Sequence, residues 1–255
     1  MRVLVLGGTG EARSLAERLA GHPDLDVVSS LAGRLREPRL PPGRLRIGGF
    51  GDVEGLRRTL LDDGIDRVID ATHPFAARIT AHAVAATRAA GVPLAVLRRP
   101  SWRQVAGDRW QRVASTAEAA AAAAAGPDGT VLLTLGRRDV VAFAGDDRHR
   151  YVVRSIEPVQ GPLPPRHEVV LGRGPFPVDR ERALLRRYAV ALLVTRDSGG
   201  ELTAAKLVAA RELGVPVVLV ERPPLPTGVT VAETVDDAEA WLTSDRGTAR
   251  AAWPS

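Results

Sequence analysis

A glycine-rich segment near the N-terminus has the residue types of a phosphate-binding turn. It follows an apolar run at residues 2–6 and precedes a predicted helix. Glycine lets the backbone turn sharply and lets phosphate oxygens approach, and the first turn of a helix offers N–H groups at the positive end of its dipole. Because Arg13 stands at the last glycine position of the G-x-G-x-x-G pattern, a plain tight turn is the alternative. The candidate cofactor contacts are Gly7, Gly8, Thr9, Gly10, Glu11 and Ala12.

The end of the second predicted strand indicates which dinucleotide would bind. NAD sites usually carry Asp or Glu there, which binds the ribose 2′-hydroxyl. This chain has Ser29, Ser30 and, a few residues later, Arg34 instead. A carboxylate would repel a 2′-phosphate and an arginine would attract it, so we expect NADPH in preference to NADH. As an alternative, Arg34 is a solvated loop residue.

A histidine follows the third predicted strand, within the segment 70–76. Thr72 and His73 then lie at the carboxyl end of a strand, where α/β sheets place their ligands. We expect Thr72 to contact the cofactor. A histidine in this place can donate a hydrogen bond or a proton near neutral pH. From its position alone, His73 is equally compatible with capping the helix or packing.

The second half of the chain has a comparable loop at residues 195–206. Its glycines lie between a predicted strand and a predicted helix, so nearby N–H groups could bind an anion. Lys206 is the single lysine among 35 Lys and Arg residues, which suggests a function, although chance retention on a helix surface is the alternative. Residues 134–139 are the counterpart of the first turn, with fewer glycines, and fit another ligand or none. The candidate substrate contacts are His73, Arg137, Ser198, Gly199, Gly200, Thr203 and Lys206.

An internal repeat indicates how these loops are positioned. Residues 91–100 and 214–223 have similar sequences, both with Gly-Val-Pro at the start, an apolar run and Arg-Pro at the end, and each half reads as alternating strands and helices. In the first half the predicted strands are 2–7, 26–31, 67–71 and 93–98, short apolar runs typical of parallel strands buried on both faces. We therefore predict an α/β fold with two similar Rossmann-like domains, a ligand cleft between them and a frayed tail. The expected ranges are 1–126, 127–245 and 246–255.

The alanine run 119–125 is predicted as a helix rather than as disorder. Ser115 or Thr116 can cap its start, and Gly126-Pro127 ends it. The cap residue and the following glycine and proline are the usual signals at the two ends of a helix.

Composition excludes several classes of protein. The chain has 255 residues, 45% hydrophobic and 25% charged, as in an ordinary soluble protein of one or two domains. It has no cysteine, which excludes disulfides, thiolate zinc sites and cysteine nucleophiles, and we predict no metal site. It has no apolar run of about 18 residues and its first residues do not resemble a signal peptide, so we expect no membrane contact and a cytoplasmic location.

The charge suggests an anionic small-molecule partner. The net charge is +5, but the basic residues are scattered and aromatic residues are only 4%, which disfavours nucleic acid. Arginine forks suit carboxylates and phosphates. A genomic bias toward arginine codons is the simpler explanation of the arginine excess itself.

Taken together, the segments 6–13, 70–76, 174–176 and 197–206 resemble the precorrin-6A reductase family. By itself, Gly174-Pro175-Phe176 is only a structural turn. The resemblance covers nearly the whole chain. It implies an oxidoreductase of cobalamin (vitamin B12) biosynthesis that uses NADPH to reduce one double bond of the macrocycle, giving precorrin-6B or its cobalt counterpart.

The resemblance also implies two Rossmann-like domains in which cofactor and tetrapyrrole meet. Carboxylates of the tetrapyrrole would pair with arginines of the second half, and neighbouring enzymes of the pathway are candidate partners. If a proton donor is used, His73 is the first candidate and Asp197 the second. The candidate arginines are Arg137, Arg138, Arg154 and Arg196.

Two other functions fit the sequence less well than this one. A short-chain dehydrogenase needs Tyr-x-x-x-Lys, but Tyr151 is followed four places later by Ser155 and Tyr188 by Leu192. A non-catalytic NADP(H)-sensing module would need the first turn and Arg34 but not the anion-binding loops of the second half. Substrate turnover distinguishes that module from an enzyme.

Overall fold

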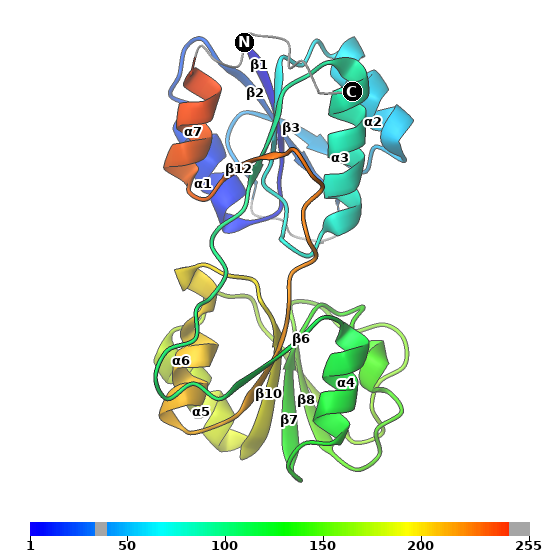
Figure 1. Ribbon diagram of the computed structural model, residues 1–255, viewed down its shortest axis with the longest axis vertical. Helices are drawn as coiled ribbons and strands as arrows, with labels where there is room; N and C mark the ends of the chain where they lie inside the picture. Colours follow the sequence, from blue (N-terminus) through cyan, green and yellow to red (C-terminus); the bar gives the residue numbers. More distant parts are fainter. Residues whose placement is uncertain (34–39, 245–255) are drawn as a thin grey trace. The chain divides into compact units, whose positions relative to one another are not determined.

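The computed structural model describes residues 1–33 and 40–244, which form two compact units (Figure 1). Unit 1 comprises residues 1–99 and the segment from Pro223 onward, and unit 2 comprises residues 100–222. Each unit is built on a six-stranded parallel sheet. Within the described ranges, no helix is both long and apolar enough to cross a bilayer.

The sheet of unit 1 has the strand order β12-β5-β4-β1-β2-β3. Its strands are β1 (Arg2–Leu6), β2 (Asp26–Leu31), β3 (Arg44–Ile47), β4 (Arg67–Asp70), β5 (Leu94–Leu97) and β12 (Thr230–Ala232). Its helices are α1 (Gly10–Leu19), α2 (Val53–Asp62), α3 (Ala77–Ala90) and α7 (Val235–Thr243). Helices α1 and α7 cover one face of the sheet, and α2 and α3 cover the other (Figure 1).

The central strand β1 shows why this sequence forms a two-faced sheet. Side chains alternate along a strand, so Val3 and Val5 pack with the core under α1 and α7, while Leu4 and Leu6 pack with the core under α2 and α3. All four side chains are at most 2% exposed. A continuous apolar run is therefore required, as predicted for a strand buried on both faces.

The sheet of unit 2 repeats this order as β6-β11-β10-β7-β8-β9. Its strands are β6 (Trp110–Val113), β7 (Thr130–Thr134), β8 (Arg150–Ser155), β9 (His167–Leu171), β10 (Val190–Arg196) and β11 (Val217–Val220). Its helices are α4 (Thr116–Ala124), α5 (Val178–Arg187), α6 (Ala205–Glu212) and the short 3₁₀ segments η1 (Val140–Phe143) and η2 (Glu201–Thr203). A 3₁₀ segment thus replaces a helix between β7 and β8.

The boundaries of the two units differ from the predicted ranges 1–126 and 127–245. Strand β6 pairs in parallel with β11, so β6 and α4 belong to unit 2, and β12 pairs with β5, so β12 and α7 belong to unit 1. The chain therefore passes from one unit to the other after Arg99 and again after Arg222. The repeat placed these two strand-helix pairs in corresponding positions, but it contained no signal that they are exchanged.

Helix α7 is held in unit 1 by a buried arginine at the start of β4. Arg67 is 3% exposed, and its Nη1 donates to the carbonyl oxygens of Trp241 and Leu242 at 2.7 and 2.6 Å. These carbonyls belong to the last turn of the helix and have no partner within it. Arg67 thus caps α7 and fixes it to the sheet.

Most predicted elements are confirmed. The four strands predicted in the first half match β1, β2, β4 and β5 to within one residue at each end. The alanine run forms α4, and Ser115 is its cap, accepting a 3.1 Å hydrogen bond from Glu118 N. The predicted alternation places a helix between strands 26–31 and 67–71 without giving its bounds, and α2 is that helix. Strand β3 was not predicted, and the predicted tail 246–255 lies outside the described residues.

Candidate functional site

Both sheets have a topological switch point at their centre. In unit 1 the strand order reverses between β1 and β4, and in unit 2 it reverses between β7 and β10. Ligands of open α/β sheets bind outside the carboxyl ends of the strands at such a point. The loops that border these two points are residues 7–9, 71–76, 135–139 and 197–204. They include more than half of the predicted site residues.

Thr9 organises the glycine-rich turn of unit 1. It is the N-cap of α1, and its Oγ1 accepts a 3.1 Å hydrogen bond from Ala12 N. The same hydroxyl donates to the carbonyl oxygen of Ala71 at 2.8 Å, which ties the turn to the loop after β4. Gly7 N donates to Ser30 O at 2.9 Å and fixes the start of the turn against β2.

The turn leaves space for a phosphate group. Gly8 has φ of +120°, a conformation that side chains disfavour, and a Cβ there would meet no atom within 4 Å. Gly10 and Glu11 are the first residues of α1, so their N–H groups have no partner within the helix. An open backbone beside unsatisfied N–H groups fits the pyrophosphate of a dinucleotide.

The negative charge of Glu11, at the start of α1, is compensated by an ion pair. Its carboxylate accepts a 2.5 Å hydrogen bond from Arg99 Nη1, and the two side chains are largely buried. Arg99 immediately precedes the first passage between units. The ion pair removes the repulsion that a bare carboxylate would exert on a phosphate.

Ser29 and Ser30 do not act together on one ligand. Both are buried on β2, and neighbouring residues of a strand face opposite sides of the sheet. Ser29 lies on the α1 side with Val27, and its Oγ has no hydrogen-bond partner among the described residues. The predicted joint contact with a 2′-phosphate is thus disfavoured. Arg34 lies outside the described residues.

The loop after β4 orients Thr72 and His73. Asp70 is 1% exposed, and its Oδ1 accepts hydrogen bonds from Thr72 N at 3.0 Å and Thr72 Oγ1 at 2.6 Å. His73 Nδ1 accepts a 3.2 Å hydrogen bond from Phe75 N. In the neutral ring the proton is therefore on Nε2, so His73 is a half-buried donor at the switch point of unit 1.

In unit 2, Asp197 is at the centre of a buried cluster of hydrogen-bond donors. It is 1% exposed; Ser101 Oγ donates to Oδ2, and Trp102 N donates to Oδ1 at 3.3 Å. Arg112 Nη1 donates to Oδ2 at 3.2 Å, and Arg222 Nε lies 3.7 Å from Oδ1. All these groups donate toward the carboxylate and none accepts a proton from it. This geometry favours a structural role over the predicted role as proton donor.

Gly199 makes room for Pro100 and Arg222, which lie where the chain enters and leaves unit 2. A Cβ on Gly199 would collide with the guanidinium of Arg222 and with the carbonyl oxygen of Pro100. Arg222 Nη2 itself donates to Pro100 O at 2.9 Å. Gly199 is therefore required by close approach within unit 2, which is a different role from the predicted contact with substrate.

Lys206 is buried rather than on a helix surface. It is 7% exposed, and its Nζ donates to Thr203 O at 2.6 Å and lies 5.0 Å from the centre of the Trp102 ring. Trp102 Nε1 donates to Gly200 O at 2.9 Å, and Thr203 Oγ1 donates to the carbonyl oxygen of Gly199 at 2.7 Å. The structure thus brings the predicted loop residues together around Trp102, with Ser198 in the same loop.

The predicted arginines of unit 2 are mostly in ion pairs. Arg137 pairs with Glu157 at 2.8 Å, Arg154 with Glu181 at 2.7 Å and Arg196 with Asp139 at 3.2 Å, whereas Arg138 is exposed. Burial lowers the pKa of the Arg196 guanidinium, and the nearby Asp139 carboxylate opposes that change. These pairs position the arginines but leave less charge for a ligand.

The residues that hold these loops were missed in the sequence. Arg99, Ser101, Arg112 and Arg222 each bind one of the candidate residues by a side-chain hydrogen bond. A signal was present for two of them, since the repeat places Arg-Pro after β5 and again after β11. The sequence did not show that both arginines would act beside a switch-point loop.

Comparison with known proteins gives concordant matches over both units. A family model described as precorrin-6x reductase CbiJ/CobK matches residues 2–243. A precorrin-6A reductase of Rhodococcus erythropolis is 48% identical over 94% of this chain and 97% of that protein. A cobalt-precorrin-6A reductase of Methanothermobacter thermautotrophicus is 35% identical over 88% and 77%. A solved structure of CobK precorrin-6A reductase is 42% identical over 95% and 96%, with a TM-score of 0.88.

Proposed function

Because the chain belongs to the CbiJ/CobK family of precorrin-6x reductases, we propose that it uses NADPH to reduce one double bond of precorrin-6A, giving precorrin-6B in cobalamin biosynthesis. The higher identity with the precorrin-6A reductase than with the cobalt-precorrin-6A reductase supports the cobalt-free substrate. We assign the cofactor to unit 1 and the tetrapyrrole to unit 2.

The observation that carries the proposal is the turn between β1 and α1. It lies at the switch point of unit 1, where dinucleotides bind, and Gly8 leaves its backbone open beside the first N–H groups of α1. Thr9 fixes this turn by accepting from Ala12 N and donating to Ala71 O. A preformed site of this kind avoids the entropy loss of ordering a flexible loop when the cofactor binds.

The choice of NADPH is supported by the lack of a carboxylate at the end of β2. Residues 27–33 contain no Asp or Glu that would bind a ribose 2′-hydroxyl. Arg34 remains the candidate for the 2′-phosphate, because Ser29 and Ser30 are buried in the strand. A guanidinium forms charge-assisted hydrogen bonds with phosphate and would therefore select the phosphorylated cofactor.

When bound, NADPH supplies the hydride for the reduction. Reduction of a double bond by hydride also requires a proton, and His73 is the residue that we assign to this step. Its Nδ1 accepts from Phe75 N, which leaves the proton on Nε2 and holds the ring in one orientation. Thr72 is fixed by its two hydrogen bonds to Asp70, and we assign it to cofactor binding at the same end of the sheet.

Anaerobic turnover tests the proposal. Purified protein is mixed with precorrin-6A and either NADPH or NADH, and the loss of nicotinamide absorbance is followed with the spectrum of the corrinoid. We expect turnover with NADPH and little with NADH. NADPH binding without turnover of precorrin-6A or of its cobalt form would contradict the enzyme and favour a sensing module.

A further inference from the structure

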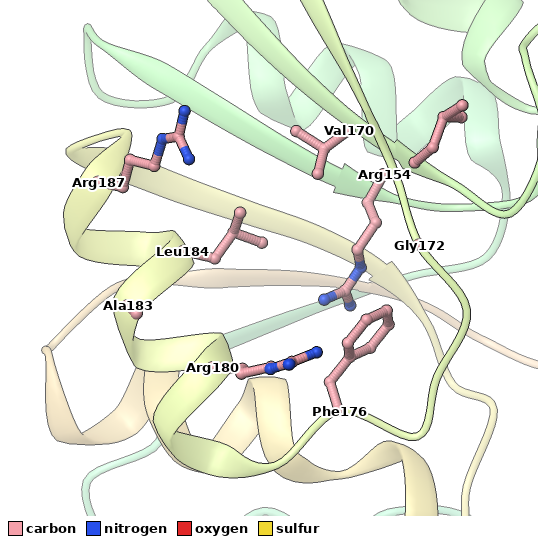
Figure 2. Close-up of a pocket in the computed structure, with 9 residues that line it drawn as sticks. Arg154, Val170, Gly172, Phe176, Arg180, Ala183, Leu184 and Arg187 are labelled. Carbon is pink, nitrogen blue, oxygen red and sulfur yellow. The ribbon is translucent and has the colours of Figure 1, made fainter.

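Unit 2 contains a pocket that the switch-point loops do not form (Figure 2). It has a volume of about 260 Å³ and lies between the ends of β8 and β9 and helix α5. Val170, Leu184 and the ring of Phe176 supply apolar surface, and Arg154, Arg180 and Arg187 supply charge. Strands β8 and β9 are parallel to β7 and β10, so the loop after β9 begins at the same end of the sheet as the switch-point loops. This loop contains Phe176.

One of the three arginines is neutralised and rigid. Arg154 Nη1 donates to both carboxylate oxygens of Glu181 at 2.8 and 2.7 Å, and its guanidinium lies 4.5 Å from the centre of the Phe176 ring. The side chains of Arg154 and Glu181 are only 11% and 3% exposed. This pair and the ring form a fixed wall that does not need a ligand to order it.

The other two arginines form no close ion pair. Arg180 and Arg187 are exposed, and neither has a salt bridge in the described part of the chain, although Arg187 is near enough to Glu168 to lower the pKa of that carboxyl. Both lie on α5 with Leu184 between them, on one face of the helix and about 10 Å apart at 1.5 Å per residue. In Figure 2 the guanidinium of Arg180 points across the pocket toward Phe176 and Arg154.

The pocket thus combines two exposed arginines that form no salt bridge in the described residues with an apolar centre and an aromatic ring. We propose that it binds one edge of the tetrapyrrole substrate, with one peripheral carboxylate paired with Arg180 and another with Arg187, and the pyrrole ring between them against Phe176 and Leu184. This inference rests on the proposed function for the identity of the ligand. The pocket is too small for the whole macrocycle, so it determines how the substrate is oriented.

Charge-neutral variants on one helix test the assignment. We replace Arg180→Gln and Arg187→Gln, with Arg186→Gln as the matched control, because Arg186 is an exposed neighbour on α5 that does not line the pocket. Loss of a charge-assisted pair is expected to raise KM for precorrin-6A about tenfold in each pocket variant. The Kd for NADPH and the KM of Arg186→Gln stay within about twofold of the wild type.

A second readout does not depend on turnover. The affinity for uroporphyrin III, a tetrapyrrole with acetate and propionate side chains, is measured by porphyrin fluorescence anisotropy. We expect the pocket variants to bind it about tenfold more weakly than wild type and Arg186→Gln. If the pocket variants bind the porphyrin more weakly but the wild-type protein does not turn over precorrin-6A, the result would support the pocket and contradict the reductase. Turnover with unchanged KM and unchanged porphyrin affinity in both pocket variants would overturn the pocket alone.

Discussion

The hydroxyl of Thr9 donates a 2.8 Å hydrogen bond to the carbonyl oxygen of Ala71 and so joins the two loops that border the switch point of unit 1. The same oxygen accepts from Ala12 N and caps α1. One side chain therefore fixes both the position of the glycine-rich turn and the start of the helix. Four predictions follow from relationships of this kind.

Removal of the Thr9 hydroxyl should weaken cofactor binding more than it weakens the fold. We expect Thr9→Ala to raise the Kd for NADPH about tenfold and to lower the free energy of unfolding by about 1 kcal/mol, since the cap and the tie to Ala71 are both lost. Thr9→Ser should restore most of the affinity. Fluorescence titration and urea denaturation measure the two quantities.

The matched control is the cap of α4 in unit 2. Ser115 accepts from Glu118 N in the same way, so Ser115→Ala should reduce stability by a similar amount. Its Kd for NADPH should equal that of the wild type. An equal loss of affinity in Ser115→Ala would show that the effect of Thr9→Ala comes from general destabilisation.

Replacement of His73 should slow the reaction without weakening cofactor binding. If Nε2 donates the proton, His73→Ala and His73→Gln should both reduce kcat about 100-fold, because a glutamine amide donates a hydrogen bond but is not an acid. The Kd for NADPH should be unchanged in both. His82→Gln, on α3, is the control and should keep the wild-type kcat. Recovery of kcat in His73→Gln would limit the histidine to positioning the substrate.

Replacement of Asp197 should destabilise unit 2. Asp197→Asn leaves Arg112 and Arg222 without their buried carboxylate, and we expect a loss of about 3–5 kcal/mol in the free energy of unfolding. Glu54→Gln removes an exposed carboxylate that pairs with Arg57 and should leave that free energy nearly unchanged. A stable Asp197→Asn protein with lost turnover would restore the catalytic role that the geometry disfavours.

Acid should weaken the segment between β7 and β8 through Asp146. Burial opposes ionisation of this carboxyl, but hydrogen bonds from Tyr151 and His149 outweigh it and lower its pKa from 3.8 to about 2. A lowered pKa adds stability above pH 3.8, and this contribution is lost as the pH falls through about 2.

We expect this contribution to be on the order of 1–2 kcal/mol, because solvent screens part of the interaction. Asp146→Asn should remove it and flatten the stability profile between about pH 4 and pH 2. Tyr151→Phe, which keeps the buried ring and loses the 2.6 Å hydrogen bond, should flatten it in part. Urea denaturation at a series of pH values measures the profile. An unchanged slope in Asp146→Asn would contradict this assignment.

The sequence was informative where local patterns decide the structure. The turn at residues 7–12, the strands β1, β2, β4 and β5 and the cap at Ser115 each carry a short-range signal, either an apolar run or a capping residue. Strand β3 was missed because Arg44 and Arg46 break its apolar pattern at an edge of the sheet.

Strand pairing and ion pairs between segments far apart in the chain could not be predicted from the sequence. Strands β6 and β12 have only four and three residues. Which unit each strand joins depends on the edge strand with which it pairs, β11 for β6 and β5 for β12. The pairs of Asp197 with Arg112 and of Arg99 with Glu11 likewise join residues far apart in the sequence. Local patterns therefore indicated the loops at the two switch points, whereas the structural contacts of Asp197, Gly199 and Glu11 depend on residues far away in the sequence.

Isotope transfer shows whether NADPH is the hydride donor for precorrin-6A. Two samples of NADPH are prepared, each with deuterium in one of the two configurations at the hydride-donating carbon of the nicotinamide. Each is incubated anaerobically with the protein and precorrin-6A, and the mass of the product is measured by mass spectrometry. We expect that one configuration transfers a single deuterium to precorrin-6B and that the other transfers none. Product without deuterium from either form, or no product in the presence of bound NADPH, would contradict it.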